Sequence, residues 1–364
     1  MIEKYLTDKR KVLFFVDSFK GGAGNVVQIL ARSFTDRGCK VTVCCIEGTT
    51  SGRHPLDGVD VIGVKSGWHG RLKFIDHIFK VKKIIKSTNP DCVISFLFGI
   101  SAVVGAAVSK KRDYTFVTSE RSNPAALKPH GIIKSMVRSA YAKADSIVVL
   151  FDAFKNLENS LFVDKCVTIP NPVPLMKPCA SLSHEEVTFV TIANEGPAKG
   201  LDLLIAAFAK VIKEGHNAKL YIYGDIKSNL IPEMIASNSL EDNVILAGYT
   251  HDVEKVLSES DVYIMPSRHE GFPNSLCEAM SAGKACIAFE CHAGIGELIQ
   301  NYVNGVLVPK EDVDKMASEI KNLIDNSEKI KIYGDNARKI SDIYNVNAVT
   351  DMWDSLLANI VNTR

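Results

Sequence analysis

Short apolar runs alternate with amphipathic segments along most of this chain, and a proline-rich segment divides the alternation into two stretches. Such alternation is typical of α/β domains, in which helices cover a parallel sheet. The dividing segment, residues 170–183, carries four prolines and little periodicity, as expected of a linker. A chain of 364 residues also exceeds the ~250–300 residues that one hydrophobic core usually serves. The sequence therefore predicts two α/β domains, the first at 1–172 and the second at 173–345.

The apolar runs give the expected strands. In the first domain they lie at 11–16, 40–46, 59–64, 91–96, 115–119 and 146–150, and in the second at 187–192, 219–223, 244–246, 262–265 and 285–289. Helices are expected at 26–37, 201–214, 252–259 and from 274 to a stop at Gly283. A glycine loop, Gly21-Gly22-Ala23-Gly24, separates the first strand from the first helix. In open α/β sheets, ligands bind beyond the carboxyl ends of the strands, so two such domains leave a cleft between them for a ligand.

Charge is distributed unevenly along the chain. Residues 1–178 hold 27 Lys and Arg against 15 Asp and Glu, a net charge of +12, whereas the remainder holds 16 against 27, a net charge of −11. The first half is therefore expected to face a negatively charged partner. A nucleic acid is not expected, because no nucleic-acid motif is present and few aromatic residues lie among the basic ones. An anionic membrane surface or a pyrophosphate-linked acceptor fits the charge better.

The segment from Trp68 to Lys86 combines apolar and basic residues at helical spacing. Its apolar members are Phe74, Ile75, Ile78, Phe79, Val81 and Ile85, and its basic members are Arg71, Lys73, Lys80, Lys82, Lys83 and Lys86. This basic amphipathic pattern, with a tryptophan suited to an interface, predicts a helix that lies on a membrane surface. The alternative is a helix that packs on the core and presents a basic face to water.

The nine cysteines do not indicate a disulfide framework. Their number is odd, none are spaced as Cys-x-x-Cys, and several lie in apolar strand-like runs, so reduced thiols in a cytosolic protein are expected. The N-terminus lacks the apolar core of a signal peptide. Asp312 and Asp314 are spaced like a metal-binding pair, but they lie at an expected helix start, where acidic residues cap the helix. The sequence predicts neither a metal nor a cofactor.

Residues 268–280, Arg-His-Glu-Gly-Phe-Pro-Asn-Ser-Leu-Cys-Glu-Ala-Met, carry the most specific pattern in the chain. They follow an expected strand and place Glu270 in a loop and Glu278 inside the next helix. The start of that helix offers backbone N–H groups and the positive end of the helix dipole, which favour a phosphate. Carboxylates nearby are natural acceptors for sugar and ribose hydroxyls. The pattern therefore favours a sugar nucleotide as the ligand.

This segment resembles the Glu-x7-Glu motif of the retaining glycosyltransferases of family 4, which have the GT-B fold. The resemblance covers the whole chain and is strongest over residues 187–309. It implies two Rossmann-like domains with parallel sheets that face a central cleft. It also implies that the first domain binds the acceptor, that the second binds the nucleotide sugar, and that the last helix, about 346–364, packs back on the first domain.

The resemblance also implies roles for individual residues. Glu270 and Lys199 would be catalytic, with Glu270 facing the donor sugar and Lys199 holding the departing diphosphate. Glu278 would accept hydrogen bonds from the ribose. The whole expected donor set is Gly22, Lys199, Gly248, Tyr249, Glu270, Gly271, Phe272, Asn274, Ser275, Leu276 and Glu278. The expected acceptor side is Gly21, Gly22, Glu120 and Arg121.

One expected cation is missing. Members of this family usually carry an arginine a few residues ahead of the Lys-Gly pair, but Asn194 and Gly196 occupy the corresponding positions here. A fixed cation stabilises the charge that develops on the diphosphate as the sugar leaves. Its loss should slow catalysis unless Arg268 or Arg121 takes its place.

The resemblance implies a metal-independent transferase that moves a hexose or N-acetylhexosamine, with retention, from a nucleotide diphosphate sugar to a lipid-linked or growing glycan. UDP is the expected carrier, and bacterial surface polysaccharide is the expected product. The protein would be cytoplasmic and peripheral on the inner face of the plasma membrane. Two alternatives stay open. One is a catalytically impaired adaptor that binds glycan or a partner enzyme, and the other is a sugar-nucleotide epimerase with the same fold.

Overall fold

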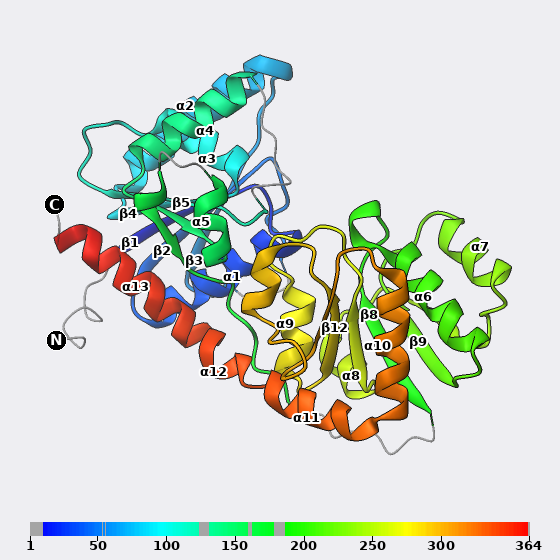
Figure 1. The fold of residues 1–364 in the computed structure, drawn as a ribbon. Coiled ribbons are helices and arrows are strands. Elements are labelled where there is room, and N and C mark those ends of the chain that lie inside the picture. Colours follow the sequence, from blue (N-terminus) through cyan, green and yellow to red (C-terminus); the bar gives the residue numbers. More distant parts are fainter. Residues whose placement is uncertain are drawn as a thin grey trace. The chain divides into compact units, whose positions relative to one another are not determined.

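The computed structural model describes residues 10–52, 54, 56–123, 131–158, 162–177 and 186–362 (Figure 1). The chain divides into two compact units. The N-terminal unit comprises Met1–Pro172 together with Val346–Arg364, and the C-terminal unit comprises Val173–Asn345. Each unit is built around its own parallel sheet. The central cleft stays a prediction.

A seven-stranded parallel sheet forms the centre of the N-terminal unit, in the order β3-β2-β1-β4-β5-β6-β7. The strands are β1 (Lys11–Val16), β2 (Lys40–Ile46), β3 (Val59–Val64), β4 (Cys92–Phe96), β5 (Thr115–Ser119), β6 (Ser146–Val149) and β7 (Cys166–Thr168). The strand order reverses between β1 and β4, as in Rossmann-like folds. Strands β4, β5 and β6 are buried at every residue, as expected where helices cover both faces of a parallel sheet.

The helices of this unit are α1 (Gly21–Asp36), α2 (Gly70–Thr88), α3 (Phe98–Ala107), α4 (Gly131–Lys143), α5 (Asp152–Glu158), the 3-10 turn η1 (Val163–Lys165) and α13 (Val346–Asn362). The last helix, α13, packs on this unit. Trp353 is fully buried and stacks on Phe96 with ring centroids 6.1 Å apart. Arg37 of α1 forms ion pairs with Asp351 at 2.6 Å and Asp354 at 2.7 Å, which hold the two helices together.

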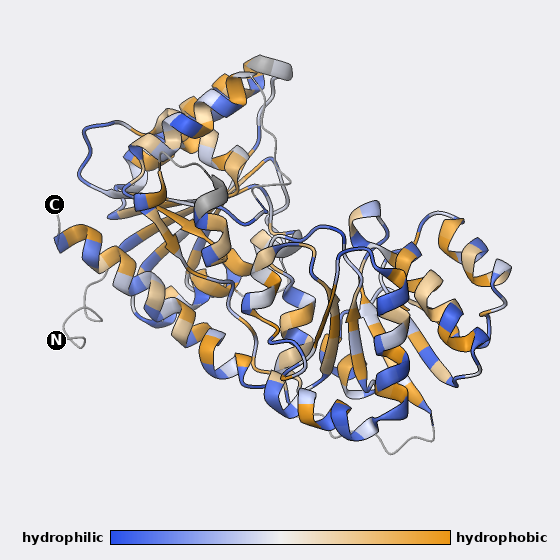
Figure 2. Ribbon diagram, viewed as in Figure 1, coloured by the Kyte–Doolittle hydropathy of each residue, from blue (hydrophilic) through white to orange (hydrophobic). Residues whose placement is uncertain are grey.

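The C-terminal unit contains a six-stranded parallel sheet in the order β10-β9-β8-β11-β12-β13. Its strands are β8 (Val187–Ile192), β9 (Ala218–Tyr223), β10 (Val244–Gly248), β11 (Val262–Met265), β12 (Ala285–Phe289) and β13 (Val306–Val308). Its helices and 3-10 turns are η2 (Pro197–Lys199), α6 (Leu201–Lys213), α7 (Leu230–Ser237), α8 (Val253–Ser258), α9 (Asn274–Ser281), η3 (Ala293–Glu297), α10 (Val313–Asp325), α11 (Ser327–Ala337) and α12 (Ile340–Tyr344). Figure 2 shows that the strands are mainly hydrophobic. Phe189, Phe208 and Ile264 belong to the buried core between the sheet and its helices.

The first helix differs from its expected range. It begins at Gly21 rather than Val26, so the glycine loop forms the first turn of α1. Gly21 has a positive φ of 83°, and a Cβ at Gly24 would collide with the carbonyl oxygen of Ser18. Glycine is therefore required here because the backbone turns sharply and the helix passes close to the preceding loop.

Three further expectations can be compared with the fold. Among the described residues, no helix is long and apolar enough to span a membrane. Eight cysteines lie in the described part, and all of them are free thiols. Asp312 is the N-cap of α10, where its side chain accepts a hydrogen bond from the Lys315 backbone, so its capping role is confirmed.

Candidate active site in the C-terminal unit

The loops after β8, β10 and β11, together with helix α9, carry most of the predicted donor residues. These strands are parallel, so their carboxyl ends lie at one edge of the sheet. Two glycines allow the loop backbones to touch. A Cβ at Gly200 would collide with the Pro266 carbonyl oxygen, and one at Gly224 would collide with the Ala193 carbonyl oxygen. The loop after β8 is thus pressed against the loops after β9 and β11.

This close packing brings Lys199 and Glu270 together. The Arg268 backbone N–H donates to the Ala198 carbonyl at 2.8 Å, which aligns the two loops side by side. Lys199 Nζ then lies 2.7 Å from Glu270 Oε1, and Ser267 Oγ donates to the same oxygen at 2.7 Å. The two residues that were predicted to act on opposite ends of the donor therefore form an ion pair with each other.

Arg268 is not a spare cation. It donates to both carboxylate oxygens of Asp202, at 2.8 and 2.6 Å, and to Glu311 at 3.2 Å. Hydrogen bonds with Asp202 raise the pKa of Arg268 above its ordinary value. Because two carboxylates already neutralise this guanidinium, it does not replace the missing arginine in this structure.

Asn194, one of the two positions where the family arginine was expected, joins two loops. Asn194 Oδ1 accepts a hydrogen bond from the Asp225 backbone N–H at 3.0 Å. The neighbouring Glu195 accepts from the backbone N–H groups of Lys227 and Ser228, each at 2.7 Å. These bonds join the loop after β8 to the loop after β9. An arginine at 194 would remove one of them.

Helix α9 carries Glu278 on its second turn and begins directly after Pro273. Buried Tyr263 of β11 donates from its hydroxyl to Ser275 Oγ at 2.8 Å, which fixes the first turn of the helix against the sheet. The Asn274 N–H donates to the Phe272 carbonyl at 3.0 Å. Ser275 and Leu276 carry N–H groups of the first turn, which have no partner within a helix.

His292 is a partly buried titratable residue for which no pattern in the sequence indicated a role. Its Nδ1 accepts from the Gly294 N–H at 3.1 Å. Burial lowers the pKa of His292 from 6.5 to about 4, so the ring is neutral at neutral pH. Cys291 forms a hydrogen bond with the Glu270 backbone, and burial raises the pKa of its thiol to about 12. Both residues follow β12.

Two residues of the predicted donor set, Gly248 and Tyr249, lie at the end of β10 and directly after it. Gly248 has a positive φ of 74°, and its carbonyl accepts from the Gly224 N–H at 2.9 Å. Tyr249 is half exposed and packs edge to face with His251, with ring centroids 4.9 Å apart. An exposed aromatic pair at this edge of the sheet offers a surface on which the base of a nucleotide can stack.

The predicted acceptor residues lie in the N-terminal unit. Gly21 and Gly22 are exposed at the start of α1, after β1. Glu120 and Arg121, after β5, are both buried. Arg121 donates to the Ile169 carbonyl at 3.1 Å, and burial lowers its pKa to about 9. This environment favours a structural role for Arg121, which is therefore not a second substitute for the missing arginine.

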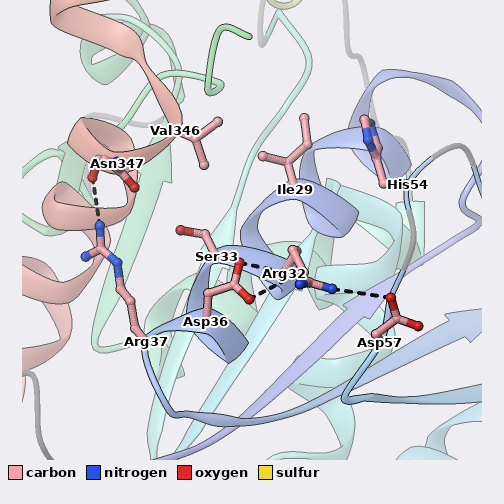
Figure 3. Close-up of a pocket in the computed structure, with 9 residues that line it drawn as sticks. All are labelled: Ile29, Arg32, Ser33, Asp36, Arg37, His54, Asp57, Val346 and Asn347. Atoms are coloured by element: carbon pink, nitrogen blue, oxygen red, sulfur yellow. Dashed lines mark hydrogen bonds and ion pairs between the residues drawn. The ribbon is translucent and has the colours of Figure 1, made fainter. Parts of the chain in front are cut away.

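A surface pocket of about 750 Å³ in the N-terminal unit contains none of the predicted residues (Figure 3). It is lined by Ile29, Arg32, Ser33, Asp36, Arg37, His54, Asp57, Val346 and Asn347. Arg32 pairs with Asp36 at 3.0 Å and Asp57 at 3.5 Å, and Arg37 donates to the Asn347 carbonyl at 3.1 Å. The two arginine side chains of this pocket therefore already bind groups of the protein. Elsewhere in the described residues, no group of three His, Cys, Asp or Glu side chains is placed to hold a metal ion.

Two protein-family models match the chain. The model described as "Glycosyltransferase Family 4" matches residues 20–177, and the model described as "Glycosyl transferases group 1" matches residues 185–326. An uncharacterized glycosyltransferase of Haemophilus influenzae is 28% identical over 221 residues, which cover 60% of this chain and 62% of that protein. A poly(ribitol-phosphate) alpha-N-acetylglucosaminyltransferase of Staphylococcus aureus is 29% identical over 218 residues, which cover 59% of this chain and 44% of that protein. The matched region is thus less than two thirds of either relative.

Solved structures resemble the whole chain. A glycosyltransferase from Rickettsia africae superposes with a TM-score of 0.82 at 20% identity, over 98% of this chain and 100% of the other. HepE of Anabaena, solved in complex with UDP-glucose, superposes with a TM-score of 0.79 at 19% identity, over 96% of this chain and 100% of the other. These similarities confirm the predicted fold class, the two-sheet α/β architecture called GT-B.

Proposed function

Because the chain belongs to the glycosyltransferases, with a family 4 domain followed by a group 1 domain, we propose that it transfers a sugar from a nucleotide diphosphate donor to a glycan acceptor. The sugar is a hexose or an N-acetylhexosamine, the carrier is UDP, and the anomeric configuration is retained. The acceptor is a lipid-linked or growing glycan of a bacterial surface polysaccharide. No metal takes part in the proposed reaction.

One observation carries the proposal. Lys199 and Glu270 are 71 positions apart, and the fold places their side chains 2.7 Å from each other where two parallel strands end. A cation beside a carboxylate at this edge can bind the two ends of a sugar diphosphate. Lys199 would stabilise the diphosphate, and Glu270 would accept from sugar hydroxyls and stabilise positive charge at the anomeric carbon.

The remaining donor groups extend from this pair. The start of α9, with the N–H groups of Ser275 and Leu276, would face the diphosphate. Glu278 would accept from the ribose, and Tyr249 would stack on the base.

The proposed reaction requires no side chain as a base. The acceptor hydroxyl oxygen attacks the anomeric carbon, and the bond from that carbon to the donor phosphate breaks. The bonding electrons move to the phosphate oxygen, which then takes the proton of the attacking hydroxyl. The protein therefore supplies position and electrostatic stabilisation.

Relatives support the choice of donor and product. The S. aureus relative is named for transfer of N-acetylglucosamine to poly(ribitol phosphate), and HepE was solved with UDP-glucose. Both names fit a UDP-linked hexose or N-acetylhexosamine for this chain as well.

A two-stage experiment tests this function. The thermal midpoint is first measured with UDP, GDP and ADP, and UDP is expected to raise it most. UDP-glucose and UDP-N-acetylglucosamine are then incubated with the protein, and slow release of UDP and free sugar is expected. Binding of UDP without any cleavage of a range of donors would favour the adaptor. Conversion of a donor into its epimer, with no release of UDP, would establish the epimerase instead.

A further inference from the structure

An apolar stripe runs along the outer face of α2 in the N-terminal unit. Trp68, just before the helix, and Leu72, Ile75 and Phe79 are 57%, 53%, 48% and 68% exposed. Within the helix, the spacings of three and four residues place Leu72, Ile75 and Phe79 on one side, and Trp68 precedes them in the segment before Gly70. Large apolar residues are common on surfaces as single residues, but three aligned on one helix face with an exposed tryptophan before them indicate an interaction site.

The opposite face of α2 already packs on the protein. His77, Val81 and Ile85 are buried, and α2 contacts α3 and β1. The sequence left open the alternative that this helix packs on the core. That packing is present, but it uses His77, Val81 and Ile85 and not the residues of the outer stripe. It does not account for the outer stripe.

Lysines continue the outer face over the last two turns. Lys82, Lys83 and Lys86 are exposed and follow the apolar stripe at helical spacing. Lys73 and Lys80 differ from them, because Lys73 pairs with Glu47 at 2.8 Å and Lys80 pairs with Asp76 at 2.7 Å. The side chain of Arg71 lies outside the described part of the chain.

The lysine end of α2 borders a basic surface pocket of about 520 Å³. Lys82 and Lys86 line it from the helix, and Lys111 lines it from the loop after α3. Two carboxylates, Asp91 and Asp113, also line the pocket, and the fourth basic residue, Arg112, is paired with Asp145 at 2.8 Å. Three lysines against two carboxylates leave a positive balance that suits a phosphate group.

A second helix repeats the combination of apolar and basic residues. Ile132 and Ile133 of α4 are 75% and 43% exposed, and Lys134 and Arg138 are exposed beside them. Both α2 and α4 contact α3. The two exposed surfaces are thus carried by helices that share one packing partner (Figure 1).

From these exposed apolar and basic residues we propose that the outer face of α2 docks on an anionic phospholipid surface. Trp68, Leu72, Ile75 and Phe79 enter the boundary between headgroups and acyl chains, and Lys82, Lys83 and Lys86 contact lipid phosphates. The net charge of +12 over residues 1–178 complements such a surface. The biological sense of this docking rests on the proposed function, in which the acceptor is lipid-linked.

Composition argues against a protein as the occupant. Lysine is depleted at protein–protein interfaces, whereas helices that lie on membranes combine lysines with exposed aromatic and aliphatic residues. A second copy of the same chain related by a twofold axis would bring identical, like-charged patches toward each other.

Vesicle flotation tests the proposal with the full chain and without donor or acceptor. The protein should float with vesicles of phosphatidylcholine and phosphatidylglycerol, less with added salt, and poorly with phosphatidylcholine alone. The Lys82/Lys83/Lys86→Glu triple variant should lower the partition constant by on the order of 100-fold or more. A matched variant, Lys213/Lys331/Lys339→Glu, changes exposed lysines of the C-terminal unit by the same charge and should leave partitioning within about twofold.

A second variant tests the apolar stripe. Ile75→Ser with Phe79→Ser should weaken flotation while the thermal midpoint stays unchanged, because both side chains are exposed. Equal flotation on neutral and anionic vesicles, or equal loss in the two lysine variants, would overturn the proposal. So would a dimer in solution that Phe79→Ser converts to a monomer, since the stripe would then bind a second copy. UDP binding by the same variants is measured in a separate experiment. Loss of flotation with unchanged UDP binding concerns only the docking surface, whereas absence of UDP binding in the wild type would concern the proposed transferase function.

Discussion

At the scale of single residues, the pair of Lys199 and Glu270 determines how the site meets its ligand. Lys199 Nζ is 2.7 Å from Glu270 Oε1, so each charge neutralises the other. A diphosphate must therefore compete with Glu270 for the lysine. Partly exposed pairs of this kind contribute modestly, about 0.2–1 kcal/mol. That small energy lets a charged ligand open the pair.

The first prediction concerns this competition. Glu270→Gln removes the charge that competes with diphosphate and keeps an oxygen that can accept from Ser267. Affinity for UDP should rise, by up to about fivefold, while release of UDP from a UDP-sugar falls. Calorimetry gives the affinity, and Glu233→Gln, an exposed carboxylate on α7, is the control that should change neither. A weaker affinity for UDP in Glu270→Gln would mean that the carboxylate does not mask Lys199.

The second prediction concerns His292, whose folded pKa of about 4 lies below its ordinary value of 6.5. Because the folded pKa is lowered, protons bind preferentially to the unfolded chain. The stability that the neutral ring contributes is fully present above pH 6.5 and is lost as the pH falls towards 4. The loss should be on the order of 2–3 kcal/mol.

Urea unfolding of the wild type and of His292→Gln between pH 7.5 and about pH 4 measures that loss, because other titrating groups cancel in the difference. The wild type should lose more free energy of unfolding than the variant on acidification. Parallel curves for the two proteins would show that the ring does not titrate as a buried neutral group.

At the scale of elements, close backbone contacts decide where helices begin. The glycine turn after β1 is part of α1, and Gln28 donates to the carbonyls of Phe19 and Gly24 at 3.2 and 3.0 Å. These bonds hold the loop against the helix. Glycine in a helix normally weakens it, so its use here reflects the space available.

The third prediction compares two helical glycines. Gly24→Ala should lower the free energy of unfolding by about 1–3 kcal/mol, because the new methyl group meets the backbone of Ser18. Gly99→Ala in α3 should raise it by about 0.4–1 kcal/mol, because nothing lies within 4 Å of the added Cβ. Denaturant unfolding measures both. A stabilising effect at both positions would contradict the tight packing at Gly24.

The strands illustrate what the sequence could predict. Seven strands, at 11–16, 40–46, 59–64, 115–119, 187–192, 262–265 and 285–289, were predicted to the residue. Most of them are buried, and strands buried on both faces appear as continuous apolar runs. Strands β7 and β13, with three residues each, were missed because so short a run carries no pattern. The contact between Lys199 and Glu270 could not be predicted either, because it depends on the packing of two loops distant in sequence.

At the scale of the whole molecule, each of the two α/β units has its own proposed role. The C-terminal unit carries the pair of Lys199 and Glu270 and the helix start of α9, and it would bind the donor. The N-terminal unit carries the excess of basic residues and the outer face of α2, and it would meet the acceptor and the membrane. The sequence indicated this division through its charge asymmetry and its Glu-x7-Glu segment. It did not indicate that Arg268 is neutralised by Asp202 and Glu311, which only the packed loops reveal.

The neutralisation of Arg268 leaves Lys199 as the residue on which cleavage of the donor should depend, and UDP release from a UDP-sugar measures that dependence most directly. Removal of one electrostatic stabiliser of a transition state typically lowers turnover by about 10²–10³-fold, and Lys199→Ala should show a loss of that size. Lys213→Ala, an exposed lysine in the last turn of α6, should release UDP at the wild-type rate. Unchanged UDP release by Lys199→Ala would contradict the account, because the diphosphate would then be held at a different site.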